Sequence, residues 1–149
     1  MTEIEREADA VWTGSLVDGS GVITRVTSGA LAQLPITWAA RTQQPNGKTS
    51  PEELLAAAQA SCYAMALSNT LAKAGNEPEQ LDVTAVCGAD RSTGALVVTT
   101  MDITVRGRVP GLDQSGFEAA ARQAEQGCPV ANALRNNLAM TVHATLVEA

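Results

Sequence analysis

The sequence predicts an α+β fold in which one long buried helix packs against mainly antiparallel strands. Residues 50–75 have the composition of a helix, whereas 81–87 and 95–109 alternate between apolar and polar side chains, as strands with one buried face do. Residues 138–147 alternate in the same way and predict a closing strand. Because no internal repeat and no linker divides the sequence, we expect a single domain over residues 1–149.

The long helix has sequence signals at both ends. Ser50 can cap the first free N–H groups, Pro51 suits the first helical position, and Glu53 is placed to complete a capping box with Ser50. The interior is rich in Ala and Leu, which are strong helix formers. Gly75 is a stop signal because glycine readily adopts the left-handed conformation that ends many helices.

The composition of this helix predicts where it lies in the fold. From Leu54 to Leu67 there is no charged residue, and small Ala side chains occur on every face. A helix at the surface of a globular protein would instead show one polar face. We therefore expect the helix to be covered on most sides, with neighbouring backbone approaching closely over the small side chains.

Shorter β-rich segments precede the helix. Residues 10–14 and 21–27 surround a turn of Gly, Asp and Ser, which predicts a hairpin, and residues 34–38 predict a third strand. Residues 42–49 are polar and contain Pro, Asn and Gly, so we expect a loop that leads the chain into the helix.

The second half of the chain combines a hairpin with two more helices. A turn at 91–94 joins the two long alternating strands into a second hairpin. Ser115 is predicted to cap a helix over 116–125, because apolar side chains there recur at helical spacing. Pro129 occupies a favoured first position, which predicts a short helix ending near Leu134.

Composition excludes several classes of function. The net charge of −6, without a basic cluster, argues against binding to nucleic acid, whose phosphates require grouped Lys and Arg. The sequence has no apolar run of about 18 residues and begins with polar, acidic residues, so we expect a soluble cytoplasmic protein that does not bind membranes. With one His and no close Cys pair, ligands for zinc lack workable spacing, and we expect no metal or other cofactor.

The three cysteines lie in different surroundings. Cys62 is flanked by small and apolar residues, where a thiol is more often an inert apolar group. Cys128 lies at the predicted start of a helix, where free N–H groups and the helix dipole stabilise a thiolate, so its position alone favours neither a reactive nor an inert thiol. Cys87 lies on the same strand face as Val83 and Ala85, which favours core packing.

Arg41, Glu52 and His143 all have ordinary structural interpretations. Arg41 is predicted to close a strand before the polar loop, where arginine is usually solvated. Beside a buried thiol, however, its guanidinium would favour the thiolate and could bind a substrate oxygen. Glu52 suits the first turn of the helix as a partner of the helix dipole. His143 fits an ordinary strand position, and we assign it no role.

Two segments together resemble a known family. The run Pro51–Ser68, which opens Pro-Glu-Glu-Leu-Leu and contains Cys62, and the motif Gly127-Cys128-Pro129-Val130 are similar to the OsmC/Ohr family of osmotically inducible and organic hydroperoxide resistance proteins. The Glu-Glu-Leu opening and the Gly-Cys-Pro-Val motif resemble the OsmC branch more than the Ohr branch. The resemblance extends from about residue 10 to the end of the chain, and two thiol motifs are far more specific than one.

The resemblance implies an OsmC-like fold and a thiol peroxidase that acts on organic hydroperoxides as an intertwined homodimer, with two active sites at the subunit interface. It places the peroxidatic role on Cys62 and the resolving role on Cys128, through a Cys62–Cys128 disulfide. The family's active-site arginine and glutamate would be Arg41 and Glu52. The reductant implied is a dithiol, such as that of a lipoylated protein. Another hypothesis is a non-catalytic, dimeric redox-sensing or small-ligand-binding protein.

Helix geometry restricts how these residues could meet. Ten residues at the helical rise separate Glu52 from Cys62 by roughly 15 Å, too far for one shared site if the helix is straight. Either the helix breaks between them, although no Pro or Gly gives a reason, or Glu52 serves the Cys62 of a partner subunit. The second alternative predicts an obligate dimer.

Overall fold

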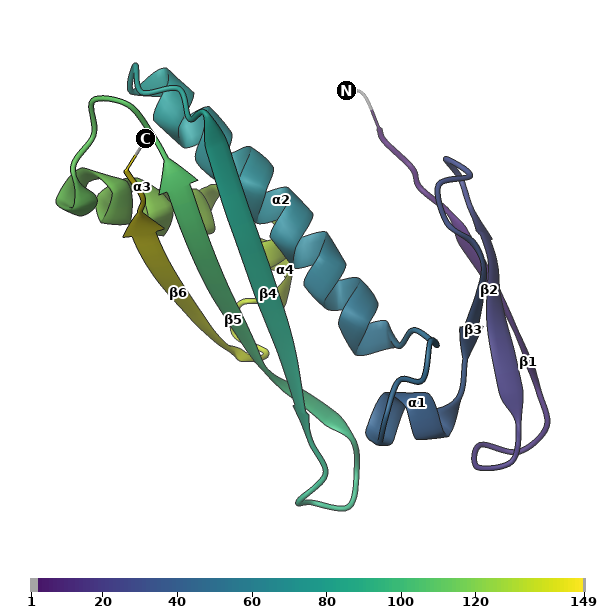
Figure 1. Ribbon diagram of the computed structural model, residues 1–149. Helices are drawn as coiled ribbons and strands as arrows, with labels where there is room; N and C mark the ends of the chain where they lie inside the picture. The colour runs from purple at the N-terminus through teal and green to yellow at the C-terminus, as the bar shows by residue number, and fades with distance from the viewer. Residues whose placement is uncertain (1–2, 149) are drawn as a thin grey trace. The chain divides into compact units, whose positions relative to one another are not determined.

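The computed structural model describes residues 3–148, and the chain forms two compact units, Met1–Leu54 and Leu55–Ala149. Residues 1, 2 and 149 of the predicted domain lie outside the described residues. Figure 1 shows a small sheet in the first unit and, in the second, a sheet accompanied by the long helix and two shorter ones. The predicted α+β fold is confirmed.

The first unit contains a three-stranded antiparallel sheet in the order β1-β2-β3. β1 (Ala8–Thr13) and β2 (Ser20–Val26) form the predicted hairpin. β3 (Ala32–Ile36) confirms the third strand, which pairs with β2. Its end differs from the prediction, because the strand stops at Ile36 rather than continuing to Trp38.

A short helix, α1 (Trp38–Thr42), follows this strand and corrects the position predicted for Arg41. The Thr37 side chain caps α1 by accepting a hydrogen bond from the Ala40 N–H at 3.1 Å. With this cap and two alanines in its first turn, the segment favours a helix over a strand. Arg41 therefore lies in the last turn of a helix and not at a strand end.

The long helix has the predicted limits. α2 spans Pro51–Lys73 without interruption, and the Ser50 Oγ accepts a hydrogen bond from the Glu53 N–H at 3.2 Å. At the other end Gly75 has φ +81°, and the Asn76 N–H donates to the Leu71 carbonyl at 2.9 Å. This bond between residues five apart is typical of a glycine-terminated helix.

The second unit contains the sheet β4-β5-β6. β4 (Gln80–Asp90) and β5 (Val97–Arg108) form the predicted antiparallel hairpin, and β6 (Ala139–Leu146) is the predicted closing strand. β6 runs parallel to β5, which its alternation alone did not reveal. A parallel neighbour requires a crossover, and α3 (Gln114–Gly127) and α4 (Pro129–Leu134) supply it.

The start of α3 corrects a second detail of the prediction. Asp113, not Ser115, is the N-cap, and its Oδ1 accepts a hydrogen bond from the Gly116 N–H at 2.8 Å. Asp and Ser are about equally good caps, so the sequence placed two suitable residues near the same helix end. The helix therefore begins at Gln114, two residues before the start that a cap at Ser115 would give.

The core of the second unit lies between the helices and the sheet (Figure 1). α2 contributes one stripe of fully buried side chains at i, i+4 spacing, which includes Tyr63 and Leu67. They belong to one cluster with Met101 of β5, Phe117 of α3 and Cys128. The composition predicted that most sides of α2 are buried. The structure buries only this one stripe within the second unit.

Other faces of α2 stay apolar and exposed, as the 68% exposure of Met65 illustrates. Within the second unit, residues 55–148, no element covers these faces. Within the same range, no helix combines the length and the hydropathy needed to span a bilayer.

Gly107 of β5 allows α3 to approach the sheet closely. A Cβ at this position would lie 2.4 Å from Cζ of the fully buried Phe117. We predict that Gly107→Ala lowers the free energy of unfolding by about 1–3 kcal/mol, because the buried ring has little room to move. Urea denaturation followed by circular dichroism measures this change.

Gly127→Ala is the matched control. A Cβ at Gly127, the last residue of α3, would meet no atom within 4 Å. This control should leave stability unchanged or raise it slightly. Equal destabilisation by both substitutions would contradict the close packing of Phe117 against β5.

Candidate active site

Cys62 lies in the middle of α2 and is partly buried. Burial raises the pKa of its thiol above the ordinary value, and the neighbouring Cys128 raises it further by a side-chain hydrogen bond and by charge. The backbone N–H of Val130, in the first turn of α4, opposes this by hydrogen bonding to the Cys62 sulfur and lowering the pKa. The net direction is upward, which favours the neutral thiol.

Cys128 joins α3 to α4 and is fully buried. It is the N-cap of α4 by its backbone, as predicted, and its side chain makes no capping hydrogen bond. The sulfur instead accepts a hydrogen bond from Gln59 Nε2 at 3.5 Å. The structure therefore brings together the two cysteines that the sequence singled out, although they are distant in the chain.

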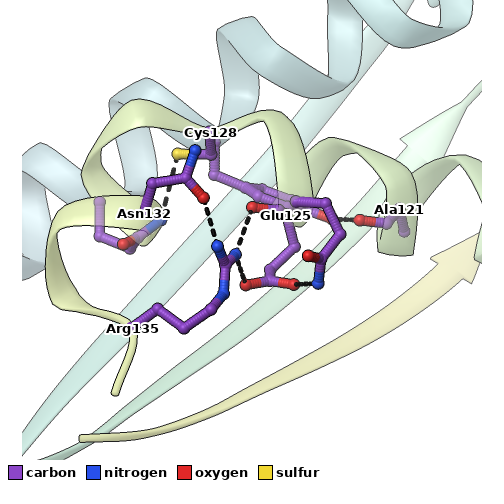
Figure 2. Close-up of polar contacts among 8 residues, drawn as sticks. Ala121, Glu125, Cys128, Asn132 and Arg135 are labelled. Carbon is purple, nitrogen blue, oxygen red and sulfur yellow. Dashed lines mark hydrogen bonds and ion pairs between the residues drawn. The ribbon is translucent and has the colours of Figure 1, made fainter. Parts of the chain in front are cut away.

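An arginine fixes the junction that holds Cys128. Figure 2 shows Arg135 reaching from the end of α4 toward Glu125 of α3 and Asn132 of α4. One terminal nitrogen of Arg135 donates to the Glu125 carbonyl oxygen at 3.0 Å and pairs with the Glu125 carboxylate, while the other donates to Asn132 Oδ1. These contacts connect the two helices on either side of Cys128 and so limit the positions its sulfur can adopt.

Tyr63 provides a second connection between α2 and α3. It is fully buried, and its hydroxyl donates to the Ala121 carbonyl oxygen at 3.0 Å. Burial raises the pKa of Tyr63, and the negative charges of Glu125 and Cys128 add to the increase. The phenol is therefore a permanent hydrogen-bond donor, which keeps Cys62, the preceding residue, facing the α3–α4 junction.

Arg41 and Glu52 form a second pair, within the unit Met1–Leu54. Arg41 Nε donates to both carboxylate oxygens of Glu52, at 3.0 and 3.1 Å, and Nη2 donates to one of them at 2.7 Å. The guanidinium also lies 5.9 Å from the centre of the Trp38 ring. The family resemblance implied that Glu52 holds Arg41 by a charge-assisted hydrogen bond, and the structure contains this pair, so Glu52 has a contact beyond its place at the helix dipole.

A cavity of about 290 Å³ adjoins this pair. Its walls are almost entirely apolar, and Arg41 is the charged residue among its lining, which includes the following side chains: Trp12, Leu16, Ile36, Trp38 and Pro51. The cavity therefore combines space for an apolar group with a cation at its edge.

The other residues considered from the sequence lie on strands of the second sheet. Cys87 packs against the core on the same face of β4 as Val83 and Ala85, as predicted. His143 is exposed on β6. Among residues 3–148, no group of three or more His, Cys, Asp or Glu side chains is arranged to hold a metal ion.

Comparison with known proteins assigns the family. The family model described as OsmC-like protein matches residues 44–143. Peroxiredoxin OsmC of Escherichia coli (strain K12) is 34% identical over 137 residues, which cover 92% of this chain and 94% of that protein. The chain belongs to the OsmC-like protein family. The predicted family and its OsmC branch are confirmed.

Further relatives are consistent with this assignment. The organic hydroperoxide resistance protein of Xanthomonas axonopodis pv. citri (strain 306) is 28% identical over 95 residues, or 63% of this chain and 65% of that protein. This match is shorter and weaker than the one to peroxiredoxin OsmC.

Solved structures confirm the OsmC-like fold. An organic hydroperoxide resistance protein from Elizabethkingia anophelis has a TM-score of 0.70 at 21% identity, covering 99% of this chain and 100% of that chain. One from Legionella pneumophila has a TM-score of 0.69 at 22% identity, with coverages of 93% and 96%. At these identities the likeness shows the fold alone.

Sequence reasoning on this OsmC-like chain missed three residues beside the cysteines: Gln59, Glu125 and Arg135. Gln59 had a usable signal, because it continues the buried i, i+4 stripe of Tyr63 and would have to place an amide in the core. The ion pair of Glu125 and Arg135 gave no signal in the sequence, because the two residues meet only after the α3–α4 turn has formed.

We predict that Arg135→Met destabilises the second unit by about 1–2 kcal/mol, because one partly buried carbonyl and one carboxylate lose a charged donor. Thermal unfolding should show the loss as a decrease of a few degrees in Tm. Arg122→Met, at an exposed position of α3, is the control and should leave Tm nearly unchanged. Equal Tm values for Arg135→Met and the unmodified protein would show that this ion pair does not fix the helix junction.

Proposed function

We propose that this OsmC-like protein is a thiol-dependent peroxidase that reduces organic hydroperoxides to alcohols. The observation that carries the proposal is the contact between the Cys62 and Cys128 thiols, which have no structural need to meet in a core of apolar side chains. The relatives' names, peroxiredoxin and organic hydroperoxide resistance protein, support the same class of activity.

The chemistry proceeds in two steps. The Cys62 thiolate attacks the outer oxygen of ROOH, the O–O bond breaks, and RO⁻ takes a proton and leaves as the alcohol. Cys62 then carries a sulfenic acid. The Cys128 sulfur attacks the Cys62 sulfur, a disulfide forms, and the S–O bond breaks to release water. An external dithiol, such as that of a lipoylated protein, reduces the disulfide and restores both thiols.

The thiolate at Cys62 needs a cation, since burial within its own unit raises the pKa of this thiol. Arg41 is suited to this role because Glu52 holds its Nε and Nη2. Within residues 3–54 of its own unit no hydrogen bond engages its Nη1, which is available for a peroxide oxygen. The apolar cavity beside Arg41 would take the organic group R, which favours organic hydroperoxides over hydrogen peroxide.

We propose a homodimer in which Arg41 and Glu52 of one chain serve Cys62 of the other. α2 is unbroken from Pro51 to Lys73, so Glu52 and Cys62 are about 15 Å apart along its axis and cannot share one site. The exposed apolar faces of α2, with Met65 as an example, offer a surface that a second copy can cover. We place this dimer in the cytoplasm, where thiols are kept reduced.

Cysteine substitutions test the reaction directly. Cys62→Ser should abolish turnover of cumene hydroperoxide with a dithiol, because serine is not ionised at neutral pH. Cys128→Ser should react once per site and stop as a sulfenic acid, which dimedone traps for mass spectrometry.

Cys87→Ser is the matched control and should keep nearly full activity. Equal losses in Cys62→Ser and Cys87→Ser would refute the assignment of Cys62. A protein that forms the disulfide but shows no multiple turnover with any dithiol would favour the redox-sensing alternative.

Arg41→Met should slow peroxide reduction about 100-fold, because a donor to the developing negative charge is lost. It should also raise the pKa of Cys62, so that a higher pH is needed to reach the same fraction of thiolate. The pH dependence of Cys62 alkylation by iodoacetamide, in a Cys87→Ser background, measures the shift. Arg25→Met, which removes an exposed arginine paired with Asp9 on the same unit, should change neither quantity.

Mixed dimers identify which chain supplies Arg41. If Arg41 acts across the interface, co-refolding Arg41→Met chains with Cys62→Ser chains creates one intact site in each mixed dimer, and activity returns. If Arg41 acts within its own chain, every site of the mixed dimer is defective, and activity stays at the level of the separate variants.

A further inference from the structure

Gln59 is an unusual residue for its position. Among residues 3–148 it is the one fully buried side chain that is an amide or carries a charge. It lies on the core-facing stripe of α2, one turn before Tyr63. Leu or Met would fill this position without placing an amide in the core. Burying an amide is unfavourable unless its donors and acceptor are hydrogen-bonded.

The contacts of this amide are incomplete. Gln59 Nε2 donates to the Cys128 sulfur at 3.5 Å, and Gln59 Oε1 is buried without a hydrogen-bond partner among residues 3–148. Sulfur is a weak acceptor, so neither half of the amide is well satisfied in the reduced protein. A role in packing or in resting-state stability does not account for this arrangement.

The position relative to Cys62 suggests what completes the contacts. Gln59 and Cys62 are three residues apart on α2, so their side chains are neighbours on one helix surface, and both reach Cys128. A reduced Cys62 offers little to an amide oxygen. A sulfenic acid at Cys62 adds an O–H group, which is a strong donor, one helical turn from an acceptor that lacks a partner.

We propose that Gln59 is a positioning residue for the resolving step, its Nε2–H holding the Cys128 sulfur and its Oε1 accepting the hydroxyl of the Cys62 sulfenic acid. The inference rests on the proposed peroxidase function and extends it to a residue that contacts the Cys128 sulfur and lies one helical turn from Cys62. One amide thereby orients the attacking atom and the group that must depart.

The step balances without another reactant. Cys128 loses its thiol proton, its sulfur forms a bond to the Cys62 sulfur, and the S–O bond of the sulfenic acid breaks. The departing hydroxide takes up the proton and leaves as water. The Cys62 sulfur is reduced from the sulfenic state, the Cys128 sulfur is oxidised, and Gln59 itself is unchanged.

Gln59→Met tests the inference, because Met has a similar length and removes both halves of the amide. Rapid mixing with cumene hydroperoxide, quenching and mass spectrometry separate the two steps. We expect Cys62 oxidation within about twofold of the unmodified protein, and disulfide formation slowed about tenfold or more, as loss of a hydrogen bond in the transition state would cause. Sulfinic acid at Cys62 should accumulate in excess peroxide.

The controls distinguish positioning from folding. Gln123→Met makes the same change at an exposed position of α3 and should alter neither step. Thermal unfolding checks that Gln59→Met folds, and Gln59→Leu is a second apolar variant if it does not. Disulfide formation at the unmodified rate in a folded Gln59 variant would overturn the inference, and so would an equal slowing of both steps.

A Cys128→Ser background tests the acceptor half alone. Without a resolving thiol, the Cys62 sulfenic acid should be overoxidised faster when Gln59→Met is also present, because its hydroxyl loses its acceptor. An unchanged lifetime would overturn that half of the inference. If Cys62 formed no sulfenic acid in a protein whose only substitution is Cys128→Ser, the proposed function would be overturned instead. The two failures are therefore distinguishable.

Discussion

The second unit depends on the packing of one face of α2 against β5, α3 and the α3–α4 junction. Tyr63 and Leu67 are fully buried in this contact, and Tyr63 also donates to a carbonyl of α3. Because successive residues project from a helix about 100° apart, fixing Tyr63 also fixes the side of α2 from which Cys62 projects. The position of the thiol is thus a consequence of core packing, and it needs no loop to hold it.

The same contact places the second thiol under a different constraint. Cys128 lies between two helices, and its position depends on the angle between them, which Arg135 fixes through Glu125 and Asn132 (Figure 2). A charged network at the edge of the core therefore sets the separation of two sulfurs within it. Forming and breaking a bond between those sulfurs requires small movements, and a junction held by hydrogen bonds at its rim can accommodate them more readily than a strand inside the sheet.

Local chemistry in the sequence predicted most of the fold. Ser50 and Gly75 set the ends of α2 through bonds that involve only nearby residues, and the β4–β5 hairpin followed from its alternation. The predictions were wrong where two local signals favour different structures, or where the deciding contact joins residues far apart in the sequence. Thr37 and two alanines outweighed a β-rich run to form α1, and Asp113 rather than Ser115 capped α3.

Some residues of the candidate site could be identified from the sequence, and others could not. The cysteines were identified from their motifs, and the structure brings them together. Gln59 and Arg135 were not identified, because their importance depends on which residues face them across the core. The parallel pairing of β6 with β5 was likewise beyond the sequence, since alternation indicates a buried face but not the direction of a neighbouring strand.

The electrostatic surroundings of Cys62 connect its reactivity with the proposed dimer. Within its own unit Cys62 has one stabilising contact for a thiolate, the Val130 N–H, and burial together with Cys128 outweighs it, so its pKa rises. A thiol in this state is a slow nucleophile at neutral pH. Under the proposed function Arg41 supplies the guanidinium that reverses the shift. Glu52, which binds Arg41, lies about 15 Å from Cys62 along the unbroken α2. If a second chain supplies that charge, the reactive thiolate forms only where two chains meet, and an isolated chain keeps its thiol protonated and unreactive.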